Sequence, residues 1–302
     1  APGSVPFHLN ATITEGRNGD EAPYAQIELF WMAPDKFRRI IHSQSFNQTL
    51  IVNGTSVFEE DSPDYFPLQL HTLITAMTDP KQVLDAVKSG DRVLTKANGA
   101  VTESGITCFG PTGKLCIKEK YGLRETVAAS GHAADFTKYE MFKGKQVARV
   151  ITNAPRLGEE LLTLQIIQLE ELKSPDPALF QFSDQTKPQQ QIRFTDQSEA
   201  DLRSAVIGNQ EIIWPQTLDG GEKGPASFYI SIDSAGNVRE VQPLYTVNER
   251  ANDSAINQLM KWKYKPFTKD GLPAQAEGVL TFALDTRAWG PPSPLSDVDV
   301  RK

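Results

Sequence analysis

The sequence predicts an α+β protein: a curved antiparallel half-barrel sheet with inserted helices, followed by a small strand-strand-helix-strand unit. Short extended segments, separated by turn residues, recur from residue 5 to residue 172. Two helical patterns interrupt these segments after the fifth strand. Residues 227–284 contain two strands, a helix and a last strand, in that order. A chain of 302 residues is typical of about two domains.

The first five strands are expected to form a meander. Residues 24–32 alternate polar and apolar side chains, which is the period of a strand with one buried face. Asn53-Gly54 is a two-residue hairpin signal between the fourth and fifth strands. The expected strands cover residues 5–14, 24–32, 36–42, 47–53 and 55–59.

Two helices are expected at residues 68–78 and 80–89, and Gly90 suits the position after the second one. The first helix has one apolar face, formed by Leu70, Leu73, Ile74 and Met77. A twisted open sheet of this width tends to curl, and curling around the helices creates a concave apolar space. The remaining strands are expected at residues 92–95, 105–108, 115–119, 124–128, 136–142, 146–152 and 160–169.

One set of large apolar side chains comes from the early strands and the first helix. These side chains either line a ligand cavity or fill a dry core, and sequence pattern does not separate the two. The ligand-binding candidates are Leu29, Trp31, Phe37, Ile41, Leu50, Val52, Leu70, Leu73 and Met77.

Several of these segments resemble the LolA/LolB superfamily of periplasmic lipoprotein carriers. The similar segments are residues 29–38, with a strand, a proline turn and Phe37-Arg38, and residues 48–54 with Val57-Phe58. Residues 177–180 resemble the family's last strand. The resemblance covers residues 5–183. It implies a half-barrel with a helical lid over a hydrophobic cavity, and a non-enzymatic carrier of a lipid, an acyl chain or another apolar ligand.

The C-terminal pattern is the clearest in the chain. Residues 227–233 and 238–244 read as a hairpin around the turn residues 234–237. A helix follows, with Asn252 or Asp253 as its expected N-cap and Pro266 after its end. The apolar residues of this helix are Ala255, Ile256, Leu259, Met260 and Trp262, and the last strand covers residues 278–284.

This region resembles the C-terminal domain of TonB over residues 211–285. The similar motifs are Trp214-Pro215, residues 232–238, residues 262–266 and Asp270-Gly271. The resemblance implies docking of a protein partner of the cell envelope by strand addition. The expected edge is the last strand, or else the strand at residues 228–233. The partner-binding candidates on the last strand are Val279, Leu280, Thr281 and Phe282.

The expected boundaries are a first domain at residues 1–185, a polar linker at 186–197, a second domain at 198–286 and a loose tail at 287–302. A short helix is expected at residues 198–206. TonB itself has a membrane helix and a proline-rich spacer. This sequence shows neither feature, so an energy-transducing role is not expected.

Cys108 and Cys116 flank a turn between two strands, which is the layout of a hairpin pinned by a disulfide. Closing so short a loop contributes roughly 2–3 kcal/mol in the chain-entropy model and favours an oxidising compartment. Two reduced core thiols and half of a metal site are the alternatives. The four histidines do not cluster at ligand spacing, so no metal site is expected.

No nucleophile, phosphate-loop or zinc-protease motif is present, so no catalytic residue, cofactor or enzymatic activity is expected. The carboxylate runs at residues 59–61 and 159–160 are interpreted as solvated turns and strand edges. His42 and His71 are interpreted as structural residues rather than catalytic bases. Arg38-Arg39 either meets an anionic headgroup at a cavity mouth or, the more ordinary interpretation, faces outward.

The net charge of −7 argues against a nucleic-acid partner, and no apolar run reaches the roughly 18 residues that span a bilayer. The start Ala1-Pro-Gly3 is compatible with the mature side of a signal-peptide cleavage site. The resemblances imply a periplasmic or outer-membrane-associated protein of a Gram-negative-type bacterium, with peripheral membrane contact allowed. Two functions remain: a hydrophobic-ligand carrier with a docking domain, or an adaptor with a filled core. Ligand, partner and oligomeric state stay open.

Overall fold

The fold is taken from a computed structural model, which describes twelve ranges of the chain. These are residues 5–15, 23–62, 64–78, 92–93, 106–109, 114–118, 122–127, 133–154, 162–182, 191–208, 210–216 and 221–286. The second helix expected at residues 80–89 lies outside them, as does the tail at 287–302. Of the described helices, none is long and apolar enough to cross a membrane.

Within the described residues, twelve strands form one antiparallel sheet in the order β5-β4-β3-β2-β1-β12-β11-β10-β9-β8-β7-β6. The first meander comprises β1 (Phe7–Glu15), β2 (Pro23–Ala33), β3 (Lys36–Ser43), β4 (Asn47–Asn53) and β5 (Ser56–Ser62). The second comprises β6 (Arg92–Val93), β7 (Ile106–Phe109), β8 (Lys114–Lys118), β9 (Gly122–Val127), β10 (Ala133–Phe142), β11 (Lys145–Ala154) and β12 (Leu162–Glu171).

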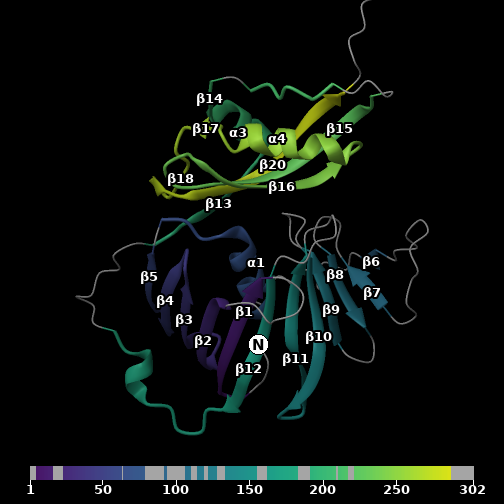
Figure 1. Ribbon diagram of the computed structural model, residues 1–302. Helices are drawn as coiled ribbons and strands as arrows, with labels where there is room; N and C mark the ends of the chain where they lie inside the picture. Colours follow the sequence, from purple (N-terminus) through teal and green to yellow (C-terminus); the bar gives the residue numbers. More distant parts are fainter. Residues whose placement is uncertain are drawn as a thin grey trace, which may run out of the picture.

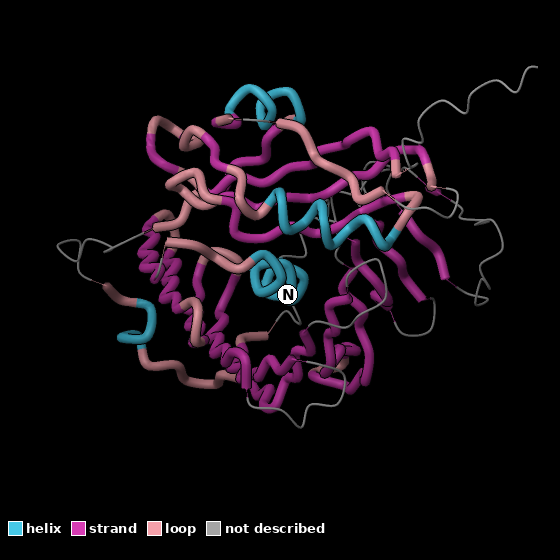
Figure 2. The backbone as a smooth tube through the Cα atoms, turned by 45° about the horizontal axis from the view of Figure 1, so that its top comes forward, coloured by secondary structure: helices cyan, strands magenta, loops and turns pink. Residues whose placement is uncertain are grey.

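The two meanders join at the centre of the sheet, where β1 pairs with both β2 and β12. This pairing connects strands that lie at opposite ends of the N-terminal region, so the sheet is continuous. The sheet curves around helix α1 (Leu68–Thr78), as Figure 2 shows, and α1 packs against β10, β11 and β12. In the described residues β5 and β6 end the strand order, so the sheet is curved and open.

The strands expected before residue 172 are confirmed, with ends that differ by a few residues, and α1 has the expected bounds. The expectation of a last strand at residues 177–180 is wrong. Pro177–Phe180 forms a 3-10 helix, η1, because Asp176 caps its first turn by accepting from the Ala178 N–H. Phe180 is buried, and η1 packs against β3 and β4.

The C-terminal unit has a four-stranded sheet in the order β13-β20-β15-β16. Figure 1 places this unit beyond one end of the large sheet. Its main strands are β13 (Phe194–Gln197), β15 (Lys223–Ile232), β16 (Val238–Thr246) and β20 (Gln275–Asp285). Short strands are β14 (Val206–Ile207), β17 (Lys263–Tyr264), β18 (Thr268–Lys269) and β19 (Leu272–Pro273). The helices are α3 (Glu199–Ala205), η2 (Glu249–Ala251) and α4 (Asn252–Leu259).

The order strand, strand, helix, strand is confirmed, as is the short helix at α3 with Ser198 as its N-cap. The expected cap of α4 is wrong. Asn252 is already helical and Ala251 precedes it without a side-chain bond, because Asn248 caps the turn of η2 instead. Trp262 lies beyond the end of α4, yet it is buried in the core of the unit. The last four residues of the expected linker form β13, which pairs with β20.

The turn between β15 and β16 depends on one glycine. Asp233 accepts hydrogen bonds from the backbone N–H groups of Ala235 and Asn237, which closes the turn. Gly236 has a φ of +88°, and a Cβ built on it would lie 2.1 Å from the carbonyl oxygen of Tyr264. Only glycine therefore fits between the turn and β17.

Candidate functional site

A row of apolar side chains crosses five strands of the large sheet. Phe7 pairs with Trp31, Trp31 with Phe37, Phe37 with Val52, and Val52 with Val57. Directly paired residues of antiparallel strands project from the same face. We call these five residues the apolar row. The sequence had indicated three of them, Trp31, Phe37 and Val52, as ligand-binding candidates.

Burial changes along the apolar row. Phe7 is fully buried and stacks on Trp31, with ring centroids 5.2 Å apart. Trp31, Phe37 and Val52 are half-buried, and Val57 is 56% exposed. The row therefore runs from the packed core of the sheet to an exposed apolar end near the β4–β5 turn.

The other candidates lie on the same side of the sheet or on α1. Leu29 and Leu50 both pair with Arg39, one strand away on either side, and Ile41 pairs with Ile27. Leu29, Ile41, Leu70 and Leu73 are at most 5% exposed and belong to one core cluster. Leu50 and Met77 are half-buried. The structure brings the nine candidates to one region, where four are packed core and five remain partly accessible.

A polar cluster interrupts this apolar face next to the row. The Arg39 guanidinium donates to Gln48 Oε1 from Nε at 2.9 Å and from Nη2 at 2.6 Å. The Gln48 amide donates in turn to Glu59 at 3.0 Å and to Asp61 at 2.9 Å. Asp61 also accepts the backbone N–H of Ile192 at 2.9 Å, so the cluster holds the chain that leads into the C-terminal unit.

Two sequence-based interpretations of these residues are wrong. Residues 59–61 are not a solvated carboxylate run, because Asp61 is only 1% exposed and Glu59 is half-buried. Arg39 does not face outward, because it lies between Leu29 and Leu50 on the buried side. A signal for this was available: a two-residue β4–β5 turn, at residues 53–54 or at 54–55, places residues 57, 59 and 61 on the face of Leu50 and Val52.

Burial shifts the pKa values of this cluster. Desolvation raises the pKa of Glu59 and of Asp61 and lowers the pKa of Arg39. His71 of α1 stacks on Phe194 with ring centroids 4.4 Å apart. Burial, and to a smaller extent the charge of Arg39, lowers the pKa of His71 to about 4. His71 is therefore neutral at neutral pH, as a structural histidine would be.

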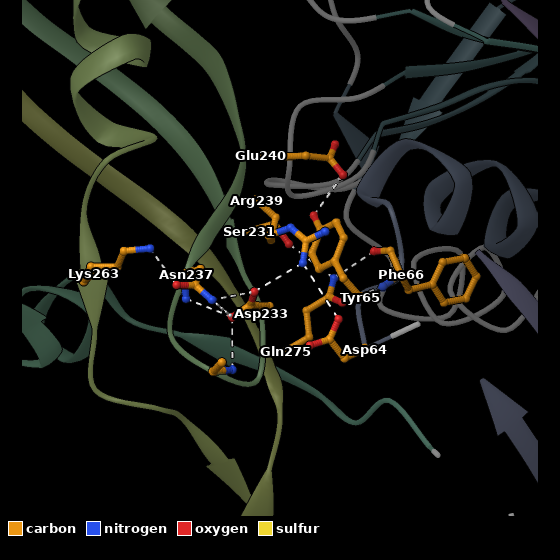
Figure 3. A network of polar contacts seen from close by, with 11 residues as sticks. Asp64, Tyr65, Phe66, Ser231, Asp233, Asn237, Arg239, Glu240, Lys263 and Gln275 are labelled. Atoms are coloured by element: carbon orange, nitrogen blue, oxygen red, sulfur yellow. Dashed lines mark hydrogen bonds and ion pairs between the residues drawn. The ribbon is translucent and has the colours of Figure 1, made fainter. Parts of the chain in front are cut away.

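A second polar network joins the C-terminal sheet to the segment before α1 (Figure 3). Gln275 binds both backbone groups of Phe66: Oε1 accepts its N–H and Nε2 donates to its C=O, each at 3.0 Å. Glu240 accepts from the Tyr65 hydroxyl and from the Leu68 N–H, both at 2.8 Å. Arg239 lies 4.7 Å above the Tyr65 ring and 3.9 Å from Asp64. We call this network the clamp.

Local sequence pattern does not predict the clamp, because its partners lie more than 170 positions apart in the chain. Three buried polar residues mark this region: Gln275 and Glu277 of β20 lie before the last strand expected at residues 278–284, and Ser231 of β15 lies in a strand expected to alternate polar and apolar side chains. Alternation alone does not say which partner such groups meet.

The predicted docking edge needs correction. The strand order places β20 between β13 and β15, and β15 between β20 and β16. Both predicted edge strands therefore have a neighbour on each side. β13 covers β20 only as far as Gly278. Beyond it, α3 covers Thr281: Glu199 accepts the Thr281 N–H at 3.2 Å and Arg203 donates to its C=O at 2.7 Å. The outer strands of this sheet are β13 and β16.

Cys108 and Cys116 are directly paired residues of β7 and β8, the register that a cross-strand disulfide requires. Their side chains lie outside what the structure describes, so the disulfide stays a prediction. Within the described residues, no group of three or more His, Cys, Asp or Glu side chains is arranged to hold a metal ion.

Several solved structures are similar to this chain, and two of them are described here. A LolA superfamily protein from Nitrosomonas europaea is 10% identical over 59% of this chain and 90% of its own, with a TM-score of 0.36. A DUF1329 family protein from Desulfovibrio piger is 10% identical over 58% of this chain and 89% of its own, with a TM-score of 0.31. No protein-family model and no curated protein matches the chain. These similarities are too low to decide a function.

Proposed function

We propose that the N-terminal unit binds an acyl chain or another hydrophobic ligand of the cell envelope, as a non-enzymatic carrier. The observation that supports this is the apolar row, which continues from a packed core to the exposed side chain of Val57. Each methylene buried against such a surface contributes about 0.8 kcal/mol, so even part of an acyl chain adds appreciable affinity. The proposed role needs no catalytic group.

Trp31 reports on this proposal directly, because it is the only one of the four tryptophans in the N-terminal region. We expect a brominated fatty acid to quench Trp31 fluorescence on binding, because bromine quenches at contact. The Trp31→Phe variant retains Trp214, Trp262 and Trp289 and should show no quenching. Native mass spectrometry of the same mixture identifies the adduct.

A charge placed in the apolar row supplies the second arm of the test. Val52→Asp should weaken fatty-acid binding at least tenfold, because burial of an unpaired carboxylate costs more than the 1.4 kcal/mol to which tenfold corresponds. Ile167→Asp, at an exposed apolar residue of the same sheet, is the matched control and should bind as the wild type. Binding that neither variant alters would contradict the proposed site.

An adaptor with a filled core and no ligand is the alternative. The burial of Leu29, Ile41, Leu70 and Leu73 favours it, since these four side chains pack against one another. If brominated fatty acid does not quench Trp31 and no lipid adduct is found, the carrier function is excluded and the adaptor function remains. In either case we propose docking of a protein partner by strand addition, with β16 rather than β20 as the receiving edge.

A further inference from the structure

The clamp places a carboxylate at the start of a helix that has none of its own. The first turn of α1 contains no acidic residue. Glu240 of β16 reaches it from the other unit, and its Oε1 atom accepts both the Leu68 N–H and the Tyr65 hydroxyl. A negative charge at a helix N-terminus interacts favourably with the helix dipole. Glu240 therefore caps α1 across the contact between the two units.

A second carboxylate lies behind the first. Glu277 of β20 is 8% exposed and accepts from the Tyr229 hydroxyl at 2.8 Å and from the Gln275 amide at 3.0 Å. That amide also donates to the Phe66 carbonyl, so Glu277 supports the residue that holds the segment before α1. Both carboxylates thus belong to one connected network.

Negative charge is in excess around the clamp. Arg239 is the only cation that the described residues bring into ion-pair contact there, 3.3 Å from Asp233 and 3.9 Å from Asp64. The other titratable groups that face the two carboxylates are Tyr65 before α1, Tyr24 of β2, Tyr229 of β15 and Asp196 of β13. The carboxylates of Glu240 and Glu277 belong to the same C-terminal sheet, so closing the contact brings only Asp64 towards them, while it covers Glu277 and part of Glu240.

Protonation of Glu240 or Glu277 removes a negative charge that is costly to bury. Desolvation by burial has the largest effect and raises the pKa of Glu240 and of Glu277 above the ordinary glutamate value; the hydrogen bonds to both groups, including the Leu68 N–H at the start of α1, and the charge of Arg239 near Glu240 act in the opposite direction. A carboxyl with a raised pKa binds a proton more tightly in the closed state than in an open, solvated one. The stabilisation of the closed state is therefore complete below the ordinary glutamate pKa and is lost as pH rises through the raised pKa.

We propose that the clamp is a pH-responsive contact between the two units, which tightens in mildly acidic solution and loosens as the solution becomes neutral to alkaline. Loosening frees the N-terminus of α1, the helix that the large sheet surrounds. The contact needs no ligand, so its test and the test of ligand binding fail independently.

Hydrogen–deuterium exchange of the full chain tests this locally. The backbone N–H groups of Phe66 and Leu68 are bonded only through the clamp, so their protection measures its closure. With each rate referred to the intrinsic rate at the same pH, protection should fall as the pH rises from about 4.3, the ordinary glutamate pKa, to about 8. Each unit of pKa difference between closed and open states changes the closed-to-open ratio tenfold across this range.

Glu240→Gln is the informative variant. Its amide oxygen can accept both hydrogen bonds that Glu240 Oε1 accepts, while the charge is removed. We expect the variant to keep Leu68 protected at about pH 8 and to flatten the pH dependence. Glu249→Gln, at an exposed glutamate of the same unit, is the control and should retain the wild-type dependence.

Equal protection at both pH values in the wild type would overturn the proposal, and so would a loss that Glu240→Gln leaves unchanged. Carbon-13 NMR titration of the glutamate carboxyls in the wild type gives a second measurement that needs no variant. A Glu240 carboxyl that titrates at or below the ordinary glutamate pKa would also overturn it.

Discussion

Replacement of Gln275 should lower the stability of the fold substantially. Its side-chain amide is fully buried and binds the N–H and the C=O of Phe66 at once. Gln275→Leu keeps a similar volume and removes both bonds. The two backbone groups of Phe66, a residue that is 2% exposed, then remain buried without these partners.

The expected magnitude follows from those two groups. A buried polar group that loses its partner costs about 1–3 kcal/mol, so two such groups cost about 2–6 kcal/mol. The Glu277 carboxylate also loses the Gln275 donor, which adds to the cost. We therefore expect the free energy of unfolding to fall by about 4 kcal/mol.

The chain contains a matched control for this prediction. Gln258 of α4 binds the N–H and the C=O of Ile213 at 2.9 and 2.8 Å, in the same two-bond arrangement. Ile213 is 76% exposed, so water replaces the lost bonds in Gln258→Leu. Glutamine and leucine have similar helix propensities, and the control should cost about 1 kcal/mol or less.

Urea denaturation followed by circular dichroism and tryptophan fluorescence measures both variants. The free energy of unfolding is obtained from the transition midpoint and its slope. If the two variants lose equal stability, burial of the Phe66 backbone is not what makes Gln275 important. A loss below about 1 kcal/mol for Gln275→Leu would refute the argument.

Two further predictions concern single positions. Gly236→Ala should destabilise the C-terminal unit by more than about 1 kcal/mol in the same denaturation assay, because the new Cβ meets the Tyr264 carbonyl. Gly271→Ala is the control: Gly271 also has a positive φ, but a Cβ there meets open space, so this variant should cost less stability. The lowered pKa of His71 makes its contribution to stability complete above its ordinary pKa and lost as pH falls towards about 4. Proton NMR should show His71 uncharged from about pH 5.5 to about pH 8, and a His71 titration near its ordinary pKa would contradict its burial.

The effects of His71 and of the clamp carboxylates on stability have opposite signs. The neutral histidine makes the whole fold less stable in acid, whereas Glu240 and Glu277 make the closed contact more favourable there. A global melting curve adds the two effects. Exchange at Phe66 and Leu68 separates them, because those two N–H groups bind Gln275 and Glu240.

Local pattern was enough to predict the strands of the large sheet, α1, α3 and the strand-strand-helix-strand order of the C-terminal unit, whereas β13, β14 and β17 were not predicted. The alternation in β2 and the single apolar face of α1 are properties of neighbouring residues, and both elements formed where expected. The cap of α4 was predicted wrongly because two asparagines compete for the role, and η2 uses Asn248 first. The similarity of residues 211–285 to the TonB C-terminal domain stays a prediction.

The candidate site was predicted in part. The apolar residues were found because strand period places Trp31, Phe37 and Val52 on one face. Arg39 and Asp61 were misjudged because charged residues on strands are usually exposed. Their burial depends on Gln48 and Ile192, which come from other strands and from the start of the C-terminal unit.

The large antiparallel sheet, the inserted helix and the C-terminal unit can be predicted from local pattern, because each follows from periods of two or 3.6 residues and from turn residues. The pairing of β1 with β12, the covering of β20 by α3 and the binding of Phe66 by Gln275 depend on how these elements pack. Phe66 and Gln275 lie 209 positions apart. A contact of this kind depends on which buried polar groups packing leaves facing each other, and no local pattern contains that information.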